Sequence, residues 1–278
     1  MGKVALITGC SSGFGLLAAV EMARAGFDVA ATMRNLEKRA LLDAAAKEAG
    51  VGLDVRRLDV TEFDSLPGFL QQLVRDRGSL DVLVNNAGMA VSGFAEDMLL
   101  AEIRRQFETN FFGHVAMTKA ALPIMRKQRS GHIIMISSIS GLVAQPAISS
   151  YSSSKHALEG WSEALRLETH SLGIRVVLVE PGAYATDIWE KNVVLGERVN
   201  TPESPNYERI QRFVQFVQKE VPKRDPHEVA QLIVRIAQDP NPRLRYIAGT
   251  DAHMGYWTKR FLPWKMWEKM IARYTKIG

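Results

Sequence analysis

Tyr151 and Lys155 are four residues apart, so on a helix their side chains share one face. A positive charge near a phenol favours the ionised form and lowers its pKa from the usual value of about 10. We therefore expect a tyrosine that exchanges a proton near neutral pH. Ser138 follows the apolar run 133–136, which is typical of a buried parallel strand. Its hydroxyl is placed to hold a carbonyl oxygen, although the YxxxK spacing also arises by chance.

A glycine-rich loop near the N-terminus has the composition of a phosphate-binding turn. Residues 3–8 read as an apolar strand that runs into TGCSSGFG, and a stripe of helical spacing follows as far as Gly26. Glycines between a strand and a helix let backbone N–H groups approach a pyrophosphate, and the helix N-terminus adds partial positive charge. The loop residues expected to bind are Gly9, Ser11, Ser12, Gly13, Phe14 and Gly15. A plain glycine-rich turn is the alternative.

The end of the second expected strand, 28–32, bears on the choice of cofactor. An acidic residue there would accept a hydrogen bond from a ribose 2′-hydroxyl, whereas an arginine accommodates a 2′-phosphate. The chain has no acid at this point and continues with Met33 and Arg34. We therefore expect NADP(H), with NAD(H) as the alternative cofactor. The other interpretation of Arg34 is a surface residue that caps a loop.

Strands and helices alternate along the rest of the chain. Further strands are expected over 55–58, 81–84, 133–136 and 174–179, and helices over 36–49, 63–77, 97–127 and from Tyr151 onward. This order predicts an α/β fold, a Rossmann-like, doubly wound parallel sheet flanked by helices, in a single domain over 1–278. Asn110 falls inside the helix 97–127, where asparagine indicates a kink or a polar network.

Such sheets bind ligands at the carboxyl ends of their strands. Gly9, Asn86, Ser138 and Gly182 all follow expected strands, so they should lie in one site. Residues 183–222 have a weaker pattern with several aromatic residues, which favours a substrate lid. Residues 253–277 predict one amphipathic helix with a basic side. Such a helix usually covers the core or a neighbouring subunit, and contact with a membrane surface is the alternative.

Composition excludes several classes of protein. The 278 residues are 46% hydrophobic and 23% charged, which is ordinary for a globular chain. The net charge of +5 comes from residues 243–278, with eight Lys or Arg and two acids, so no nucleic-acid surface is expected elsewhere. One cysteine, no signal-peptide pattern and no apolar run of about 20 residues predict a cytoplasmic protein. The six histidines have no metal-ligand spacing.

Taken together, these motifs resemble the classical short-chain dehydrogenase/reductase family over nearly the whole chain. The matching segments are TGCSSGFG from Thr8, Asp59, NNAG from Asn85, Asn110, Ser138, YSSSK from Tyr151 and PGAYAT from Pro181. The resemblance implies a catalytic tetrad of Asn110, Ser138, Tyr151 and Lys155. It implies that the glycine loop binds the cofactor together with Asp59, Val60, Asn86, Ala87, Gly88, Tyr151, Lys155, Pro181, Gly182 and Thr186. Phe14 replaces the isoleucine usual in the family.

The branch most similar to the chain contains hydroxysteroid and retinol dehydrogenases. That resemblance implies an oxidoreductase that interconverts a carbonyl and an alcohol on a bulky apolar substrate, with Tyr151 as general acid and base, in a homodimer or homotetramer. A 3-oxoacyl carrier-protein reductase is the alternative enzyme, because an acidic carrier would suit the basic C-terminal segment. A non-enzymatic NADP(H)-binding regulator is the alternative of another class, although it would not require the complete tetrad.

Overall fold

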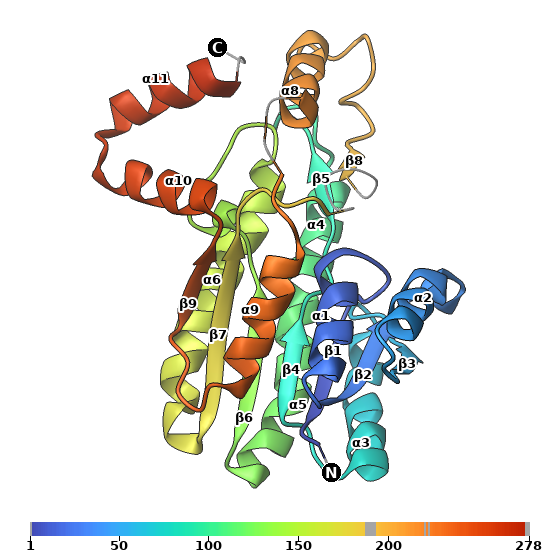
Figure 1. The fold of residues 1–278 in the computed structure, drawn as a ribbon. Helices are drawn as coiled ribbons and strands as arrows, with labels where there is room; N and C mark the ends of the chain where they lie inside the picture. The colour runs from blue at the N-terminus through green and yellow to red at the C-terminus, as the bar shows by residue number, and fades with distance from the viewer. Residues whose placement is uncertain (1, 187–192, 220, 222, 276–278) are drawn as a thin grey trace.

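A seven-stranded parallel sheet forms the centre of the molecule (Figure 1). The structure is a computed structural model that describes residues 2–186, 193–219, 221 and 223–275. Its order is β3-β2-β1-β4-β6-β7-β9, so the strand order reverses between β1 and β4. The strands are β1 (Val4–Ile7), β2 (Asp28–Met33), β3 (Asp54–Arg57), β4 (Val82–Asn85), β6 (Gly131–Ile136), β7 (Ile174–Pro181) and β9 (Arg245–Ala248). The apolar runs of the inner strands are buried on both faces, as expected for a parallel sheet between helices.

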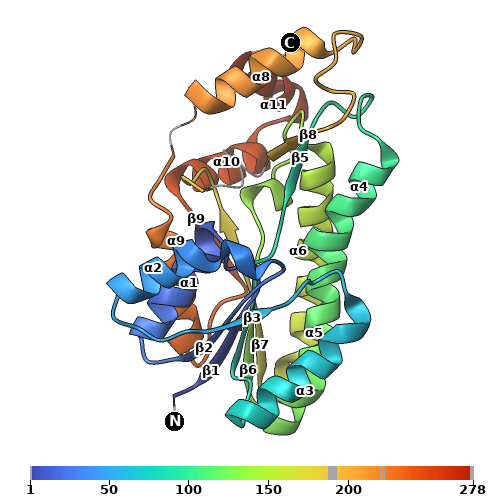
Figure 2. The same cartoon turned by 90° about the vertical axis from the view of Figure 1, so that its right-hand side faces the viewer.

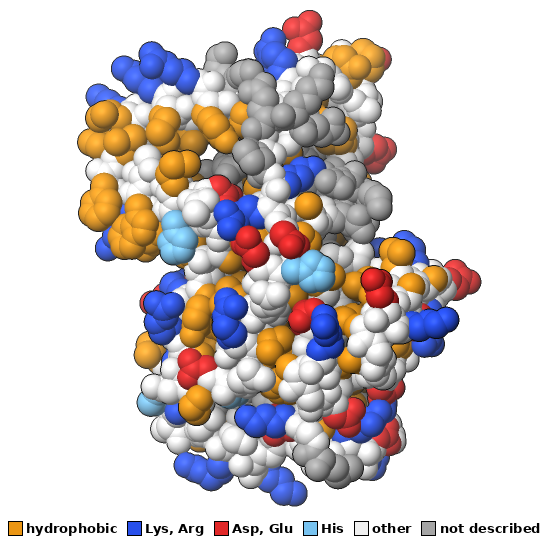
Figure 3. All heavy atoms as spheres, in the orientation of Figure 1, with side chains coloured by type: hydrophobic (Ala, Val, Ile, Leu, Met, Phe, Trp, Pro, Cys, Tyr) orange, Lys and Arg blue, Asp and Glu red, His pale blue; other side chains and the backbone are white. Residues whose placement is uncertain are grey.

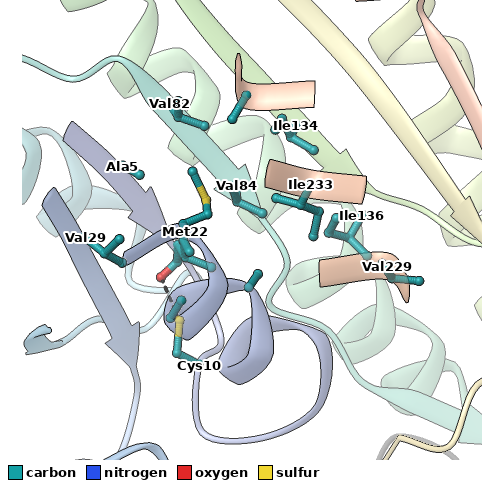
Figure 4. Close-up of a cluster of buried hydrophobic side chains, with 14 of the residues drawn as sticks. Ala5, Cys10, Met22, Val29, Val82, Val84, Ile134, Ile136, Val229 and Ile233 are labelled. Carbon is teal, nitrogen blue, oxygen red and sulfur yellow. Dashed lines mark hydrogen bonds between the residues drawn. The ribbon is translucent and has the colours of Figure 1, made fainter. Parts of the chain in front are cut away.

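Helices cover both faces of this sheet (Figure 2). One face carries α1 (Gly13–Arg24), α2 (Ala40–Glu48) and α9 (His227–Gln238), and the other carries α3 (Leu66–Arg77), α5 (Gly113–Gln128) and α6 (Ser149–Thr169). Figure 4 shows the core under the first face, where Met22 from α1 and Ile233 from α9 meet Val84 and Ile134 of the sheet. The predicted doubly wound α/β architecture is therefore confirmed.

The long helix expected over 97–127 is divided into three parts. α4 (Leu100–Phe107) passes into a π-helical segment, Glu108–Phe112, and then into α5. Asn110 lies in the π-helical segment, so the predicted irregularity at this residue is confirmed. Short 3₁₀ turns at Leu36–Arg39 and Phe63–Ser65 likewise precede α2 and α3 where single helices were expected.

The C-terminal segment differs from the single helix expected over 253–277, and that prediction is wrong. The segment forms α10 (Thr250–Phe261) and α11 (Trp264–Thr275). Pro263 separates them because a proline disfavours helical geometry in the preceding residue, and Leu262 is extended with ψ of 133°. Strand β9, which precedes α10, was also missed, because RYIA is short and begins with a charged residue.

Helices α10 and α11 leave large apolar side chains exposed beside lysines and arginines (Figure 3, upper left). Trp257, Phe261 and Trp264 are about half exposed or more, whereas Trp267 is buried. Tyr274 of α11 contacts Phe216 of α8 (Tyr207–Lys219) with ring centroids 4.9 Å apart. Among the described residues, no helix combines the length and the apolar character needed to cross a bilayer.

The expected lid, 183–222, contains α8 and β8 (Val193–Leu195). β8 pairs with β5 (Ala90–Ser92) in a separate two-stranded sheet above the main one. Residues 187–192, 220 and 222 of the lid and residues 276–277 of the expected C-terminal helix lie outside the described part of the chain. The role of this segment as a lid stays a prediction.

Gly9 follows β1, and its replacement by alanine tests how tightly the glycine loop packs on the loop that follows β4. Its φ is +74°, and an added Cβ would lie 2.7 Å from the Cα of Ala87. Gly26 has a φ of +88°, but its added Cβ would meet nothing within 4 Å. We expect Gly26→Ala to lower the free energy of unfolding by about 1–2 kcal/mol through backbone strain. We expect Gly9→Ala to lower it by about 1–3 kcal/mol more through overpacking.

Urea denaturation followed by circular dichroism measures both losses, and Gly26→Ala is the matched control for the strained backbone. Equal losses for the two variants would contradict the close packing of the two loops.

Candidate active site

A cavity of about 890 Å³ opens at the carboxyl ends of the central strands, beside the point where the strand order reverses. This is where open parallel sheets bind ligands. Nearly all the predicted site residues line it: Gly9, Ser11, Ser12, Gly13, Phe14, Arg34, Asp59, Val60, Asn86, Ala87, Gly88, Ser138, Tyr151, Lys155, Pro181, Gly182 and Thr186. Gly15 and Asn110, the other two, are buried behind the cavity wall.

The glycine loop presents an uncapped helix N-terminus to this cavity. α1 begins at Gly13, the side chain of Ser12 makes no capping hydrogen bond, and the first turn contains no acidic residue. Within the described part of the chain, the first N–H groups of the helix therefore have no side-chain cap and can bind an anion such as a pyrophosphate. Gly15 has a packing role, because a Cβ there would collide with the Asn86 amide. Asn86 donates hydrogen bonds to the carbonyls of Thr8 at 2.8 Å and Gly9 at 3.1 Å, which fixes the loop.

Two cations follow β2, with Arg34 directly after the strand and Lys38 in the 3₁₀ turn Leu36–Arg39. Arg34 and Lys38 both line the cavity, and neither has an ion-pair partner among the described residues. Asp59, at the next strand end, accepts hydrogen bonds from the Thr61 amide at 3.0 Å and the Thr61 hydroxyl at 2.7 Å. The residues around this end of the cavity could thus hold the adenosine part of a dinucleotide. Sequence analysis missed Lys38, although it follows Arg34 by four residues.

Tyr151, Lys155 and Ser138 meet in the middle of the cavity. Tyr151 and Lys155 lie in the first turns of α6, each 4% exposed, and Ser138 follows the end of β6. The Ser138 side chain accepts a hydrogen bond from the Ser140 amide at 3.1 Å and is hydrogen-bonded to the Tyr151 hydroxyl. The Lys155 ammonium donates to the Ile136 carbonyl at 2.7 Å and lies 5.8 Å from the centre of the Tyr151 ring.

The pKa of Tyr151 moves in the direction opposite to the one expected. Burial raises it to about 12, and the hydrogen bond from Ser138 offsets part of that rise. Burial also lowers the pKa of Lys155 to about 8, with the charge of Glu159 opposing the fall. The expectation failed because both groups are removed from water and the ammonium faces the Ile136 carbonyl. A phenol with a raised pKa retains its proton at neutral pH, so Tyr151 is suited to donate one.

Asn110 stabilises the site through hydrogen bonds to neighbouring segments of the chain. Its side chain donates to the Met89 carbonyl and accepts from the Met89 amide, both at 2.9 Å, and its amide lies 3.4 Å from the Ser154 hydroxyl. The Ser154 hydroxyl donates in turn to the Tyr151 carbonyl at 2.8 Å. Asn110 thereby ties the strand β5 region to the helix that carries Tyr151, which is the polar network expected of an asparagine inside a helix.

Three further residues that sequence analysis missed support the site. The His114 ring donates to the Ala87 carbonyl at 2.7 Å, and burial lowers its pKa to about 3, so the ring is neutral. Gln106 bonds the backbone of Met89 and Val91. Asp251, in the first turn of α10, accepts from the Ala183 amide at 2.7 Å and fixes the loop after β7. Only the tertiary fold shows these roles, because each side chain acts on backbone distant in sequence.

The comparisons with known proteins agree with this geometry. The family model described as short chain dehydrogenase matches residues 3–194. The chain is 42% identical over 275 residues to the uncharacterized oxidoreductase YusZ of Bacillus subtilis, covering 98% of each chain. It is 40% identical over 253 residues to human retinol dehydrogenase 8, covering 87% of this chain and 80% of the relative.

Among solved structures, a short-chain dehydrogenase from Streptomyces avermitilis superposes with a TM-score of 0.81 at 33% identity, covering 99% of this chain and 97% of the other. The matched family segment includes the glycine loop, the strand ends that line the cavity, and Ser138, Tyr151 and Lys155. The chain is therefore a member of the short-chain dehydrogenase family.

Proposed function

We propose that the protein is an NADP(H)-dependent oxidoreductase that interconverts a carbonyl and an alcohol on a bulky apolar substrate. One observation carries the proposal: Tyr151, Lys155 and Ser138 lie in the same cavity as the uncapped N-terminus of α1. A dinucleotide on that helix would extend along the strand ends toward Tyr151. Membership of the family supports a nicotinamide cofactor.

The nicotinamide, when bound, supplies the hydride for reduction or accepts it for oxidation. Ser138 and Tyr151 hold the carbonyl oxygen by hydrogen bonds from their hydroxyl groups. Tyr151 gives its proton to that oxygen, and its raised pKa means that the proton is present at neutral pH. Lys155 places a positive charge beside the phenol as that proton leaves, which stabilises the tyrosinate.

The preference for NADP(H) is supported by the charges at the end of β2. Arg34 and Lys38 face the cavity without partners among the described residues, and Met33 occupies the place where an acid would meet a ribose hydroxyl. A doubly charged phosphate would be held by both cations, whereas a hydroxyl gains little from them. The charges therefore favour NADP(H), which carries this phosphate, over NAD(H).

The apolar character of the substrate is supported by the side of the cavity below β8. Met89, which precedes β5, and Val194 of β8 line it there. A small apolar cluster that includes Val91, Met98, Val199 and Phe213 packs around β5 and α8 above the main sheet. The similarity to a retinol dehydrogenase supports a substrate of retinoid or steroid size.

Tyr151→Phe tests the proton donor. We expect turnover to fall by about 10²–10⁴-fold, because the variant has no proton to give to the developing alkoxide. NADPH binding, measured by the change in its fluorescence, should remain. Tyr256→Phe, on α10 outside the cavity, is the matched control. The assay is NADPH oxidation with retinal, steroid ketones, simple aldehydes and an acyl thioester, and undiminished turnover in Tyr151→Phe would remove the assignment.

Met33→Asp combined with Arg34→Ala tests the cofactor preference. The double variant exchanges a phosphate-binding cation for a hydroxyl acceptor, so the ratio of kcat/KM for NADPH over NADH should fall. Loss of one charge-assisted bond of about 1.5–3 kcal/mol corresponds to roughly 10–100-fold in that ratio. Arg24→Ala, at the far end of α1, controls for the loss of a surface charge. A wild-type protein that already prefers NADH would contradict the proposal.

A further inference from the structure

Two buried carboxyl groups, on α6 and β7, take no part in the chemistry described above, and the one on α6 lies a helical turn from Lys155. Glu159 follows Lys155 by one turn of α6 and is 4% exposed. Glu180 lies on β7, immediately before Pro181 at the cavity wall, and is fully buried. Buried acids are rare unless they are paired, because removal of a charge from water costs free energy. Glu159 and Glu180 should therefore have partners that offset this cost.

Arg245 of β9 joins the two acids. Its guanidinium donates to Glu159, to Glu180 at 3.3 Å, and to Glu163 at 2.6 Å. The register pairs Arg245 with Leu178, so Arg245 and Glu180 project from the same face of the sheet toward α6. One oxygen of Glu159 and one of Glu180 are buried and have no hydrogen-bond partner among the described residues. The cluster thus contains more acceptor capacity than Arg245 satisfies.

The charges around the pair decide its protonation. Burial and the negative charge of Glu159 together raise the pKa of Glu180 to about 8, and Arg245 offsets part of that rise. Burial also raises the pKa of Glu159, and the Ser137 hydroxyl and Arg245 offset part of that rise. The titratable and charged groups that face the pair are Lys155 and Glu163 from α6, Arg245 from β9 and, beyond Lys155, the neutral His114 from α5. Two buried acids with one arginine hold one proton more easily than none.

We propose that Glu159, Glu180 and Arg245 form a buried cluster in which Glu159 supplies a counter-charge that keeps the Lys155 ammonium in the charged form. The proposal rests on the proposed function, in which that charge stabilises the Tyr151 tyrosinate. Glu159 supplies negative charge one helical turn from the lysine, and Arg245 and Lys155 favour its ionised form. Glu180 acts through Arg245, which donates hydrogen bonds to both acids. The positive charge of Arg245 reduces the electrostatic repulsion between the two acids.

Lysine titration by NMR tests this cluster without reference to turnover. The protein is labelled with ¹³C in its lysines, and Lys155→Met identifies the Lys155 resonance by its loss. In Glu159→Gln we expect the titration midpoint of Lys155 to fall by about one pH unit. In Glu180→Gln we expect a smaller fall, because Glu180 is linked to Lys155 only through Arg245 and Glu159. Glu163→Gln, which removes the exposed partner of Arg245, should leave the midpoint within about 0.2 of wild type.

The alkaline limit of carbonyl reduction should move with the Lys155 midpoint in each variant. If no substrate is reduced but the midpoint still moves, the cluster is established and the proposed function fails. If reduction occurs but neither glutamine variant moves the midpoint, the cluster is overturned. If the variants do not fold, carboxyl ¹³C titration of Glu180 in the wild-type protein still tests the cluster. A titration midpoint near the ordinary value of about 4.3 would overturn the proposal.

Discussion

The removal of Tyr151 and Lys155 from water is the constraint on which the rest of the structure depends. A phenol and an ammonium that share one buried turn of α6 have opposite responses to burial. The phenol retains its proton more strongly, and the ammonium retains its proton less strongly. The surroundings of the pair compensate for this. Ser138 bonds the phenol, the Ile136 carbonyl accepts from the ammonium, and Glu159 adds negative charge beyond Lys155.

The parallel sheet makes this arrangement possible because it brings distant segments to one edge. The glycine loop follows β1, Asp59 follows β3, Ser138 follows β6 and Pro181 ends β7, so all four arrive at the same cavity. Side chains that do not face the cavity then hold these strand ends together. Asn86 fixes the glycine loop, Asn110 fixes the backbone of Met89, and Asp251 fixes the loop after β7. The C-terminal helix α10 therefore contributes to the site through Asp251 even though it lies outside the sheet.

Motifs and strands could be predicted from the sequence because they depend on local pattern. The apolar run before Ser138, the glycines after β1 and the YxxxK spacing each determine local geometry, and the parallel topology brings them together. The break at Pro263 was also readable, but the continuous stripe of aromatic residues masked it. Other features depend on the tertiary structure. The raised pKa of Tyr151 follows from burial that no local pattern shows, and Asp251, His114 and Arg245 act on groups far away in sequence.

The proton on Tyr151 is the central claim, and an ultraviolet difference titration measures it directly. Tyrosinate absorbs near 295 nm, so the difference between wild type and Tyr151→Phe isolates the one phenol. With the pKa raised to about 12 by burial, we predict no difference signal from Tyr151 up to pH 10. A free phenol would be about half ionised at that pH. A Tyr151 midpoint at or below about 9 would contradict the account, because the phenol would then be acidified by Lys155 rather than protected by burial.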